Sequence, residues 1–305
     1  MPESASQQAN KIKYFHGKRH VIGDQVIAEQ PLQIRLSFSE SSISKAQKLS
    51  PVNSRIFSIT MRTPGHDKQL ILGLLLSEGI INTFNDINEI AIEEISISNA
   101  NEQNATALNS DNSWEVKLVP SKSLNLASLE RYQMTYSSCG LCGTTSLKSL
   151  ELKSPPKSPT TKAWLNANKI GNWPTIMKEK QVLFNETGGA HAAALFDQFG
   201  TLLDIKEDIG RHNAVDKLLG ELVLCNTIEQ SDKQLAMVVS SRVSFEIVQK
   251  AVMAGIGVII AVGAVSNLAI LAAKRFDLTL IGFTNVESFN LYHGEWRMMP
   301  SAEDL

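Results

Sequence analysis

Residues 235–283 read LAMVVSSRVSFEIVQKAVMAGIGVIIAVGAVSNLAILAAKRFDLTLIGF, and the order of their apolar runs sets the architecture that we expect. The pattern predicts three strands, at 235–240, 258–262 and 278–283, and two helices between them, at 245–254 and 267–276. Strands that alternate with helices in this way are typical of parallel strands joined by right-handed crossovers. The fold class that we predict is therefore α/β, with a layered C-terminal domain.

The uncharged run 251–273 lies inside this pattern and is long enough to suggest a transmembrane helix. Its glycines and polar residues divide it into a helix end, a strand, a turn and the next helix, so we expect no membrane insertion. Residues 1–10 are polar and lack the basic and apolar segments of a secretion signal, which predicts a cytoplasmic protein. The three cysteines, two of them close together, fit a reducing compartment better than a disulfide framework.

Length and charge narrow the class of protein further. A chain of 305 residues with 43% hydrophobic residues can form two domains of ordinary size. The net charge of −2 argues against general nucleic-acid binding and against a polybasic membrane patch, because neither phosphates nor anionic lipids would be attracted overall. An anionic ligand would have to be bound by a local site.

Three segments of different composition are expected. Residues 1–28 form a polar N-terminal extension, 29–160 a smaller α+β domain that ends in a mobile cysteine loop and a proline-rich connector, and 161–305 the α/β domain. In the middle segment, alternation of apolar and polar residues predicts strands at 33–39 and 55–61, which we expect to pair, and further strands at 90–98 and 114–119. A helix over 70–76 would be capped by Asp67 and end at Gly79.

Local composition predicts the remaining elements. The Asn- and Ser-rich residues 99–112 indicate an exposed excursion. Short helices are expected on either side of the cysteines, at 124–134 and 144–150. Beyond the connector we expect a helix over 164–180 that Pro174 interrupts, a hairpin over 192–205 and a helix over 211–224.

Cys139 and Cys142 stand two residues apart in the segment SCGLCG, residues 138–143. A thiolate is a strong nucleophile, and glycine allows the backbone to expose it. Three interpretations are open. A zinc site would have to recruit distant ligands, because the third thiol is a lone Cys225, and a thioredoxin-like dithiol would be expected directly after a strand. The third interpretation is the carriage of one sulfur atom as a persulfide.

Several polar turns are expected to meet at one edge of the sheet. Gly188 and Gly189, before His191, could bring backbone N–H groups to an anion or a nucleotide ring, although a plain tight turn would explain them too. Arg211 begins a helix inside the charged segment 207–217, where it could bind a phosphate or form local salt bridges. Arg242 and the segment 283–288 follow strand ends, where open α/β sheets bind ligands. Their convergence predicts a pocket for a phosphate-bearing small molecule.

Four segments, taken in order, resemble the formate dehydrogenase accessory sulfurtransferase family, FdhD. They are CGLCG at 139–143, TGGAHAA at 187–193, EDIGRHNAVDK at 207–217 and RVSFEIVQKA at 242–251, and the similarity spans roughly residues 29–293. The resemblance implies a cytidine-deaminase-like C-terminal domain, a homodimer and no tightly held metal. The cysteines that bind zinc in cytidine deaminases have no counterpart at the matching positions of this chain. The fold would therefore serve to hold a nucleotide and not to hydrolyse one.

The resemblance also implies an activity. Such a sulfurtransferase accepts sulfur from a cysteine desulfurase and passes it to the molybdenum cofactor, bis(molybdopterin guanine dinucleotide), which is required by formate dehydrogenase. Cys139 would carry the persulfide and Cys142 would assist. The residues that would bind the cofactor are Gly188, Gly189, His191, Arg211, Arg242, Phe283, Thr284, Asn285, Val286, Glu287 and Ser288. Members of this family often have a basic residue in the loop that corresponds to 283–288. In this chain that loop contains neutral residues and the acidic Glu287.

Two other classes of protein are compatible with the same residues. One is a non-catalytic chaperone that binds and delivers the molybdenum cofactor while the cysteines are structural. The other is an interaction module stapled by zinc, which would contain stoichiometric metal.

Overall fold

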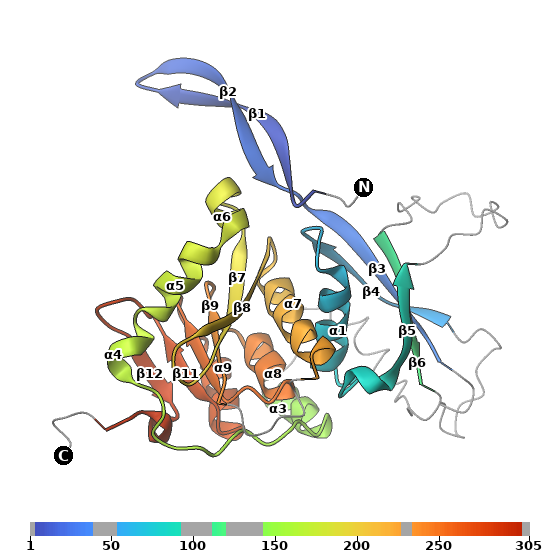
Figure 1. Cartoon of the computed structure of the whole chain (residues 1–305), viewed down its shortest axis with the longest axis vertical. Coiled ribbons are helices and arrows are strands. Elements are labelled where there is room, and N and C mark those ends of the chain that lie inside the picture. The colour runs from blue at the N-terminus through green and yellow to red at the C-terminus, as the bar shows by residue number, and fades with distance from the viewer. Residues whose placement is uncertain (1–3, 39–53, 93–111, 120–142, 227–233, 301–305) are drawn as a thin grey trace.

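The computed structural model of this chain describes residues 4–38, 54–92, 112–119, 143–226 and 234–300 (Figure 1). Strands in these residues form three sheets, whose strand orders are β1-β2, β4-β3-β6-β5 and β12-β11-β10-β9-β7-β8. Cys139 and Cys142, the helix expected over 124–134 and nearly all of the excursion expected over 99–112 lie outside the described residues.

The largest sheet has six strands. They are β7 (His191–Phe196), β8 (Leu202–Asp208), β9 (Ala236–Val239), β10 (Val258–Ala261), β11 (Thr279–Gly282) and β12 (Asn290–His293). Strands β9, β10 and β11 run parallel, while β7, β8 and β12 pair antiparallel with their neighbours. The parallel strands and the hairpin β7–β8 were predicted from the sequence, whereas β12 was not.

Helices cover both faces of this sheet. Alternate strand residues such as Met237 and Val239 pack on the side of α7 (Arg211–Leu224), α8 (Phe245–Met253) and α9 (Asn267–Arg275). Their neighbours, such as Val238, pack on the side of α4 (Ala167–Ile170) and α5 (Trp173–Lys180). This confirms a mixed α/β fold with helical layers, and the cytidine-deaminase-like assignment and the boundaries at 28 and 160 stay predictions.

A second sheet of four strands lies on the far side of α1 (Asp67–Ser77). Its strands are β3 (Gln30–Ser37), β4 (Ser54–Arg62), β5 (Ile87–Ile92) and β6 (Ser113–Leu118). The predicted pairing of β3 with β4 is confirmed, and β3 also pairs with β6. Buried residues of β3, of α1 and of α7 belong to one apolar core, so the helices α1 and α7 join the two sheets (Figure 1).

Glycines allow α1 and α7 to touch backbone to backbone. A Cβ atom on Gly73 of α1 would lie 1.9 Å from the carbonyl oxygen of Asp216, and one on Gly220 of α7 would lie 1.8 Å from that of Gln69. Both distances are far below van der Waals contact, so no side chain fits at either position.

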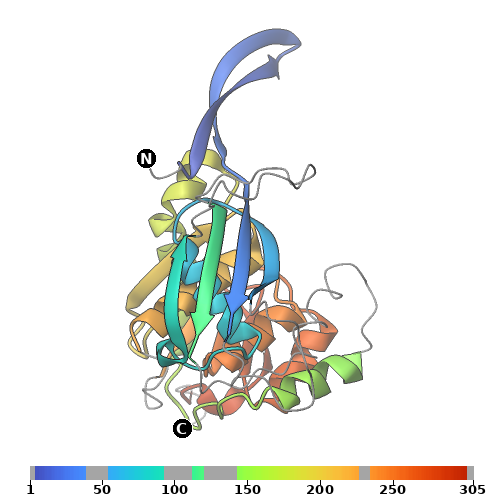
Figure 2. The same cartoon turned by 90° about the vertical axis from the view of Figure 1, so that its right-hand side faces the viewer.

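The N-terminal residues form a hairpin where the sequence predicted no strand. Strands β1 (Ser6–Phe15) and β2 (Lys18–Ile27) are joined by His16 and Gly17, both in the left-handed region at φ 47° and 74°. The hairpin extends away from the rest of the molecule, as Figures 1 and 2 show. At its root, Ser6 Oγ donates a hydrogen bond of 3.0 Å to Glu186 of α6 (Val182–Thr187).

Three local predictions are wrong for identifiable reasons. The cap of α1 is His66, because Asp67 is held by the guanidinium of Arg62 at 2.8 and 3.0 Å. The helix expected over 164–180 begins only at Ala167, and its expected interruption is the break between α4 and α5, with Pro174 in the first turn of α5, where its missing N–H costs nothing. Asn112, expected to be exposed, is buried and accepts a hydrogen bond from Arg62 at 2.7 Å.

Three short helical elements complete the described chain: α3 (Gly143–Leu152), which agrees with the helix expected after the cysteines, and the 3₁₀ turns Phe84–Asp86 and Glu295–Arg297. None of the described helices has the length and apolar character needed to cross a membrane.

Candidate functional site

The carboxyl ends of β9, β10 and β11 lie side by side and carry three adjoining loops, 240–244, 262–266 and 283–288. Val243 N donates to Ala264 O at 2.9 Å, and Phe283 N donates to Gly263 O at 3.0 Å. We call these loops, together with His191, Arg211, His212 and Glu246, the carboxyl edge. From β7 to β11 it spans three strand spacings, about 14 Å. Ligands of open α/β sheets bind at this kind of edge.

His191 and Ser240 meet where β7 begins and β9 ends. Ser240 Oγ accepts a hydrogen bond of 2.9 Å from the backbone N–H of Ala192 and lies 3.4 Å from His191 Nδ1. Burial lowers the pKa of His191, and the positive charges of Arg211 and His212 lower it further. The imidazole is therefore neutral near pH 7 and able to donate one hydrogen bond and accept another.

A pair of titratable side chains stands beside it. His212 Nε2, on the first turn of α7, lies 2.9 Å from a carboxylate oxygen of Glu246 on the first turn of α8. The hydrogen bond from His212 lowers the pKa of Glu246, and the charge of Arg211 acts in the same direction. Arg211 thus contributes positive potential to both His191 and Glu246 from the N-terminal end of α7, the end at which a helix also favours anions.

The loop 283–288 closes on itself at the end of β11. The Asn285 side chain accepts hydrogen bonds from the N–H groups of Glu287 and Ser288 at 2.9 and 3.0 Å. This turn leaves Phe283 49% and Val286 64% exposed, so two apolar surfaces face solvent next to the sheet. Thr284 is buried, and its Oγ1 has no hydrogen-bond partner among the described residues. A ligand with a flat ring and polar groups would suit such a surface.

Gly188 and Gly189 have a local structural role. Gly188 ends α6 in the left-handed region at φ 69°. A Cβ on Gly189 would lie 2.9 Å from Ile27 Cγ2, so this glycine makes room for the root of the N-terminal hairpin. The two residues lead the chain from that root into His191, and a role in binding a ligand stays a prediction.

The segment 207–217 divides between two regions. Arg211 and His212 belong to the carboxyl edge, whereas Asp208 and Lys217 form an ion pair of 2.7 Å that is buried. Asp208 accepts the backbone N–H of Thr63 at 3.0 Å, and Lys217 donates to the Thr63 carbonyl at 2.8 Å. These residues therefore hold the end of β4 against α7.

A second buried pair strengthens the same junction. Lys250 of α8 binds both carboxylate oxygens of Asp216 at 2.7 and 2.8 Å, and Ser77 of α1 donates to Asp216 at 3.0 Å. The contact ties α1, α7 and α8 together. We refer to Thr63, Asp208, Asp216, Lys217 and Lys250 as the buried junction.

The structure therefore brings part of the predicted set together. His191, Arg211, the exposed Arg242 and the loop 283–288 all belong to the carboxyl edge. Sequence reasoning did not single out Ser240, His212 or Glu246, although each lies in a segment that it had noted. His212 and Glu246 pair across 34 residues of chain, so this contact depends on the fold and leaves no local signal in the sequence.

The chain that follows the two cysteines is fixed at the opposite edge of the sheet. Lys153 pairs with Glu78 at 2.7 Å, Glu151 pairs with Arg275 at the end of α9, and Pro156 packs against Gly255 before β10. Within the described residues, no group of three or more His, Cys, Asp and Glu side chains could hold a metal ion.

Comparison with known proteins gives concordant matches. Residues 49–299 match the sequence model of the FdhD/NarQ family. The chain is 40% identical to the "Sulfur carrier protein FdhD" of Corynebacterium efficiens, covering 89% of this chain and 90% of that one. It is 36% identical to the protein of the same name from Sulfurisphaera tokodaii, covering 96% and 100%.

A solved structure supports the fold. The crystal structure of "a putative formate dehydrogenase accessory protein" from Desulfotalea psychrophila superposes with a TM-score of 0.67. The superposition covers 97% of this chain and 100% of that one, at 20% sequence identity.

Proposed function

This chain belongs to the FdhD/NarQ family, and from that premise we propose that it is a sulfur carrier that serves formate dehydrogenase. The observation that carries the proposal is the identity of 36–40% to sulfur carrier proteins over nearly the full length of both chains. More specifically, we propose that sulfur is accepted from a cysteine desulfurase and passed to bis(molybdopterin guanine dinucleotide), the substrate. The protein would act in the cytoplasm as a homodimer.

Cys139 is the residue that we propose to carry the sulfur. Its thiolate attacks the terminal sulfur of a donor persulfide, a new S–S bond forms on Cys139, and the donor cysteine leaves as a thiolate. In the second transfer the acceptor supplies the electron pair for its bond to the terminal sulfur, the S–S bond breaks, and Cys139 leaves as a thiolate. Cys142 is the thiol that assists this release.

The carboxyl edge is where we propose that the guanine dinucleotide binds. Arg211 and Arg242 would supply the positive charge for the phosphates, because a guanidinium matches phosphate geometry. Phe283 and Val286 would contact a base, and Thr284 Oγ1 would gain the hydrogen bond that it lacks within the described residues. The acidic Glu287 makes phosphate binding by this loop less favourable than binding by the two arginines.

Substitution of Cys139 tests the sulfur-carrier function. Cys139→Ala should fold, bind guanosine diphosphate and leave formate dehydrogenase inactive in cells that lack the natural protein. Cys225→Ala is the matched control, because Cys225 is exposed at the end of α7, outside the carboxyl edge, and should retain full activity. Full formate dehydrogenase activity with Cys139→Ala would refute the proposal.

The chaperone alternative predicts a different mass spectrum. After incubation with a desulfurase and cysteine, a sulfur carrier gains the mass of one sulfur atom on Cys139, and the Cys139→Ala variant does not. A chaperone gains no sulfur under conditions in which the desulfurase is active, yet still binds the nucleotide. Metal analysis of the same sample tests the zinc-stapled module, which requires a stoichiometric ion.

A further inference from the structure

The loop 283–288 is braced by contacts of its backbone. Asn285 N donates a hydrogen bond to Ser288 O at 2.9 Å, which closes the turn. Gly171, directly after α4, packs on the same turn, because a Cβ atom there would lie 2.6 Å from the carbonyl oxygen of Asn285. A loop that is fixed in this way presents its side chains to a ligand without paying for their ordering on binding.

Phe283 begins this loop in a strained conformation. Its φ of 53° lies in the left-handed region, where a bulky side chain is rare and costs free energy. The ring is half exposed, so burial of apolar surface does not offset that cost. Strain of this kind is typical of positions that hold a side chain toward a ligand. The exposed ring is a flat surface on which a nucleobase can stack.

Glu287 is the acidic residue of the loop. Its backbone N–H is held by the Asn285 side chain at 2.9 Å, while its side chain is exposed. Within the part of the chain that the structure describes, the Glu287 carboxylate has no hydrogen bond and no ion pair. A free carboxylate repels a phosphate-bearing ligand, and is favourable in such a site only if the ligand brings N–H donors to it.

The donors of the common nucleobases differ in a way that a carboxylate can detect. Guanine has two adjacent donors on its Watson–Crick edge, the N1–H and the 2-amino group, and the two oxygens of a carboxylate can accept both. Adenine and cytosine have an acceptor nitrogen beside their amino group, and uracil has a carbonyl oxygen on each side of its N–H. A carboxylate would face a lone pair on each of these three bases, so Glu287 favours guanine.

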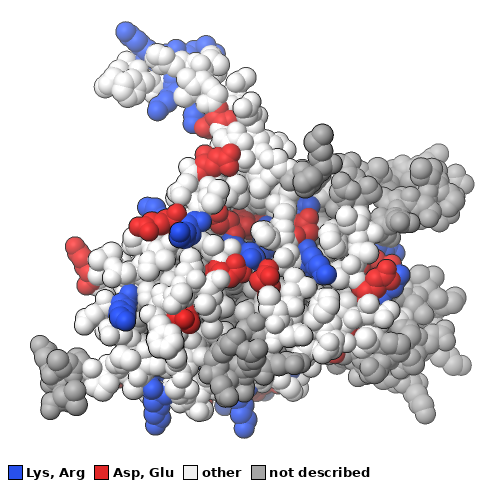
Figure 3. Space-filling model, viewed as in Figure 1, with Lys and Arg blue, Asp and Glu red and all other residues white. Residues whose placement is uncertain are grey.

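Charge elsewhere in the molecule does not provide this selection. Acidic and basic side chains are interspersed over the body on the face that Figure 3 shows, so attraction of phosphates depends on the local Arg211 and Arg242. Phosphates are common to all nucleotides, and the two arginines therefore cannot distinguish one base from another. The loop follows β11, two strand spacings or about 10 Å from the end of β9 that precedes Arg242. This separation leaves room for a ribose between a base at the loop and phosphates at the arginines.

We propose that Glu287 is the residue that selects guanine, by accepting the N1–H and the 2-amino N–H of a base stacked on Phe283. The inference rests on the proposed binding of the guanine dinucleotide at the carboxyl edge. It adds the direction of the ligand, with the base at the end of β11 and the phosphates toward α7 and α8.

Calorimetry of the full-length chain with four nucleoside diphosphates tests the selection. Inosine diphosphate lacks the 2-amino group of guanosine diphosphate, xanthosine diphosphate has a carbonyl oxygen in its place, and adenosine diphosphate has an acceptor at N1. The natural chain should bind guanosine diphosphate about tenfold or more tightly than each of the other three. Glu287→Gln should weaken binding of guanosine diphosphate by about tenfold or more and bind xanthosine diphosphate at least as tightly, because an amide N–H can donate to the 2-carbonyl oxygen.

Glu295→Gln is the matched control. Glu295 is exposed and lies by the opposite end of β11, where Gly294 O accepts a hydrogen bond of 2.9 Å from Thr279 Oγ1, so this variant should keep all four Kd values. If the natural chain binds guanosine diphosphate and Glu287→Gln binds it equally well, or weakens all four ligands alike, the inference is overturned while the proposed cofactor site stands. A natural chain that binds none of the four overturns both.

Discussion

The buried junction and the carboxyl edge use the same sequence segment for opposite purposes. Residues 207–217 supply Asp208 and Lys217 to the junction, where the two side chains are 0% and 1% exposed and are paired with each other. The same segment supplies Arg211 and His212 to the edge, where the side chains are partly exposed and face Glu246 and His191. A run of charged residues can therefore be half structural and half available to a ligand.

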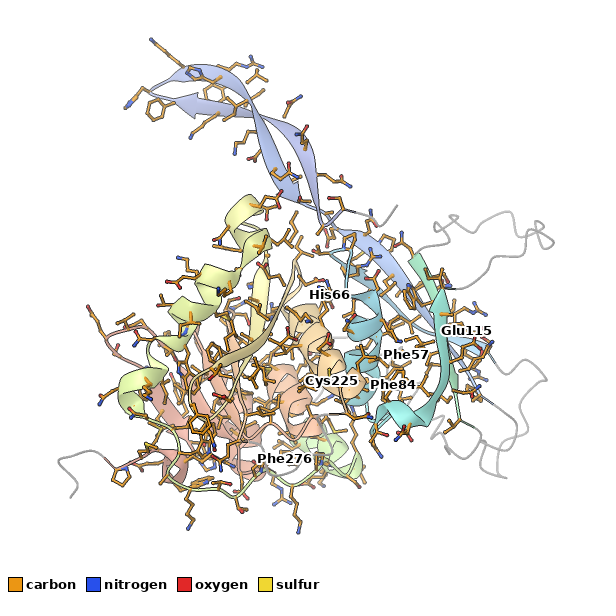
Figure 4. All side chains as sticks on the ribbon, viewed as in Figure 1. Phe57, His66, Phe84, Glu115, Cys225 and Phe276 are labelled. Atoms are coloured by element: carbon orange, nitrogen blue, oxygen red, sulfur yellow. The ribbon has the colours of Figure 1, made fainter. Side chains whose placement is uncertain are left out.

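The buried junction and the carboxyl edge differ in how their charges are compensated. At the junction each carboxylate has an ammonium partner within 2.8 Å and further hydrogen bonds, which a buried ion pair requires. At the edge the two guanidinium groups, Arg211 and Arg242, are matched in number by the carboxylates of Glu246 and Glu287 without any of them being enclosed as at the junction, and the neighbouring Thr284 hydroxyl lacks a partner among the described residues. Figure 4 shows the side chains on the ribbon, with His66 at the start of α1 and Cys225 at the end of α7, the two helices that the junction connects. Stability and binding should therefore respond to different substitutions.

The largest effect is expected for Lys217→Met. The substitution leaves the Asp208 carboxylate buried without its ammonium, which costs about 3–5 kcal/mol of unfolding free energy. Urea unfolding measures it. The control is Lys117→Met, whose partner Glu89 is exposed, and it should leave the unfolding free energy nearly unchanged. Equal losses for the two variants would remove the distinction between junction and surface.

Arg211→Met should leave stability nearly unchanged and weaken binding. If the edge holds the guanine dinucleotide, loss of one phosphate contact raises the Kd for guanosine diphosphate by about tenfold or more, measured by calorimetry. Arg275→Met is the matched control, because Arg275 lies at the opposite edge and pairs with Glu151. The assignment of the edge fails if both variants bind the nucleotide like the natural chain.

The smallest effect concerns pH. Burial lowers the pKa of His191, so the unfolded chain takes up a proton on this residue more readily than the folded one. The associated stability is present above about pH 6.5 and is lost as the pH falls from there through the lowered folded pKa. The natural chain should lose unfolding free energy between about pH 7.5 and 5.5, and His191→Gln should make this loss smaller by less than about 1 kcal/mol. Urea unfolding at the two pH values measures the difference. His16→Gln, on the exposed tip of the hairpin, is the comparison, and an equal change there would refute the assignment.

The fold could be predicted where periodicity is local. The helix Arg211–Leu224 and the parallel strands β9 to β11 follow directly from apolar runs, because each run is buried on its own sheet or helix face. The hairpin β1–β2 was missed because its strands bury almost nothing, and only the His16-Gly17 turn gave a signal. The break between α4 and α5 could also be predicted, because proline is disfavoured inside a helix and tolerated in its first turn, where Pro174 lies.

The site could be predicted only in part. Arg211, Arg242 and the loop 283–288 follow strand and helix ends, so topology places them on one edge. The roles of Asp208 and Lys217 could not be inferred, because their partner Thr63 is about 150 residues away in the chain. Cys139 and Cys142 are known here only from the sequence motif and the family.

The contact of Gly73 with Asp216 and of Gly220 with Gln69 restricts how this molecule can move. With no side chain between the two backbones, α1 cannot roll or slip along α7 without a steric clash. This crossing is therefore a poor place for a hinge between the two sheets, and a ligand that reaches the carboxyl edge has to do so without one here.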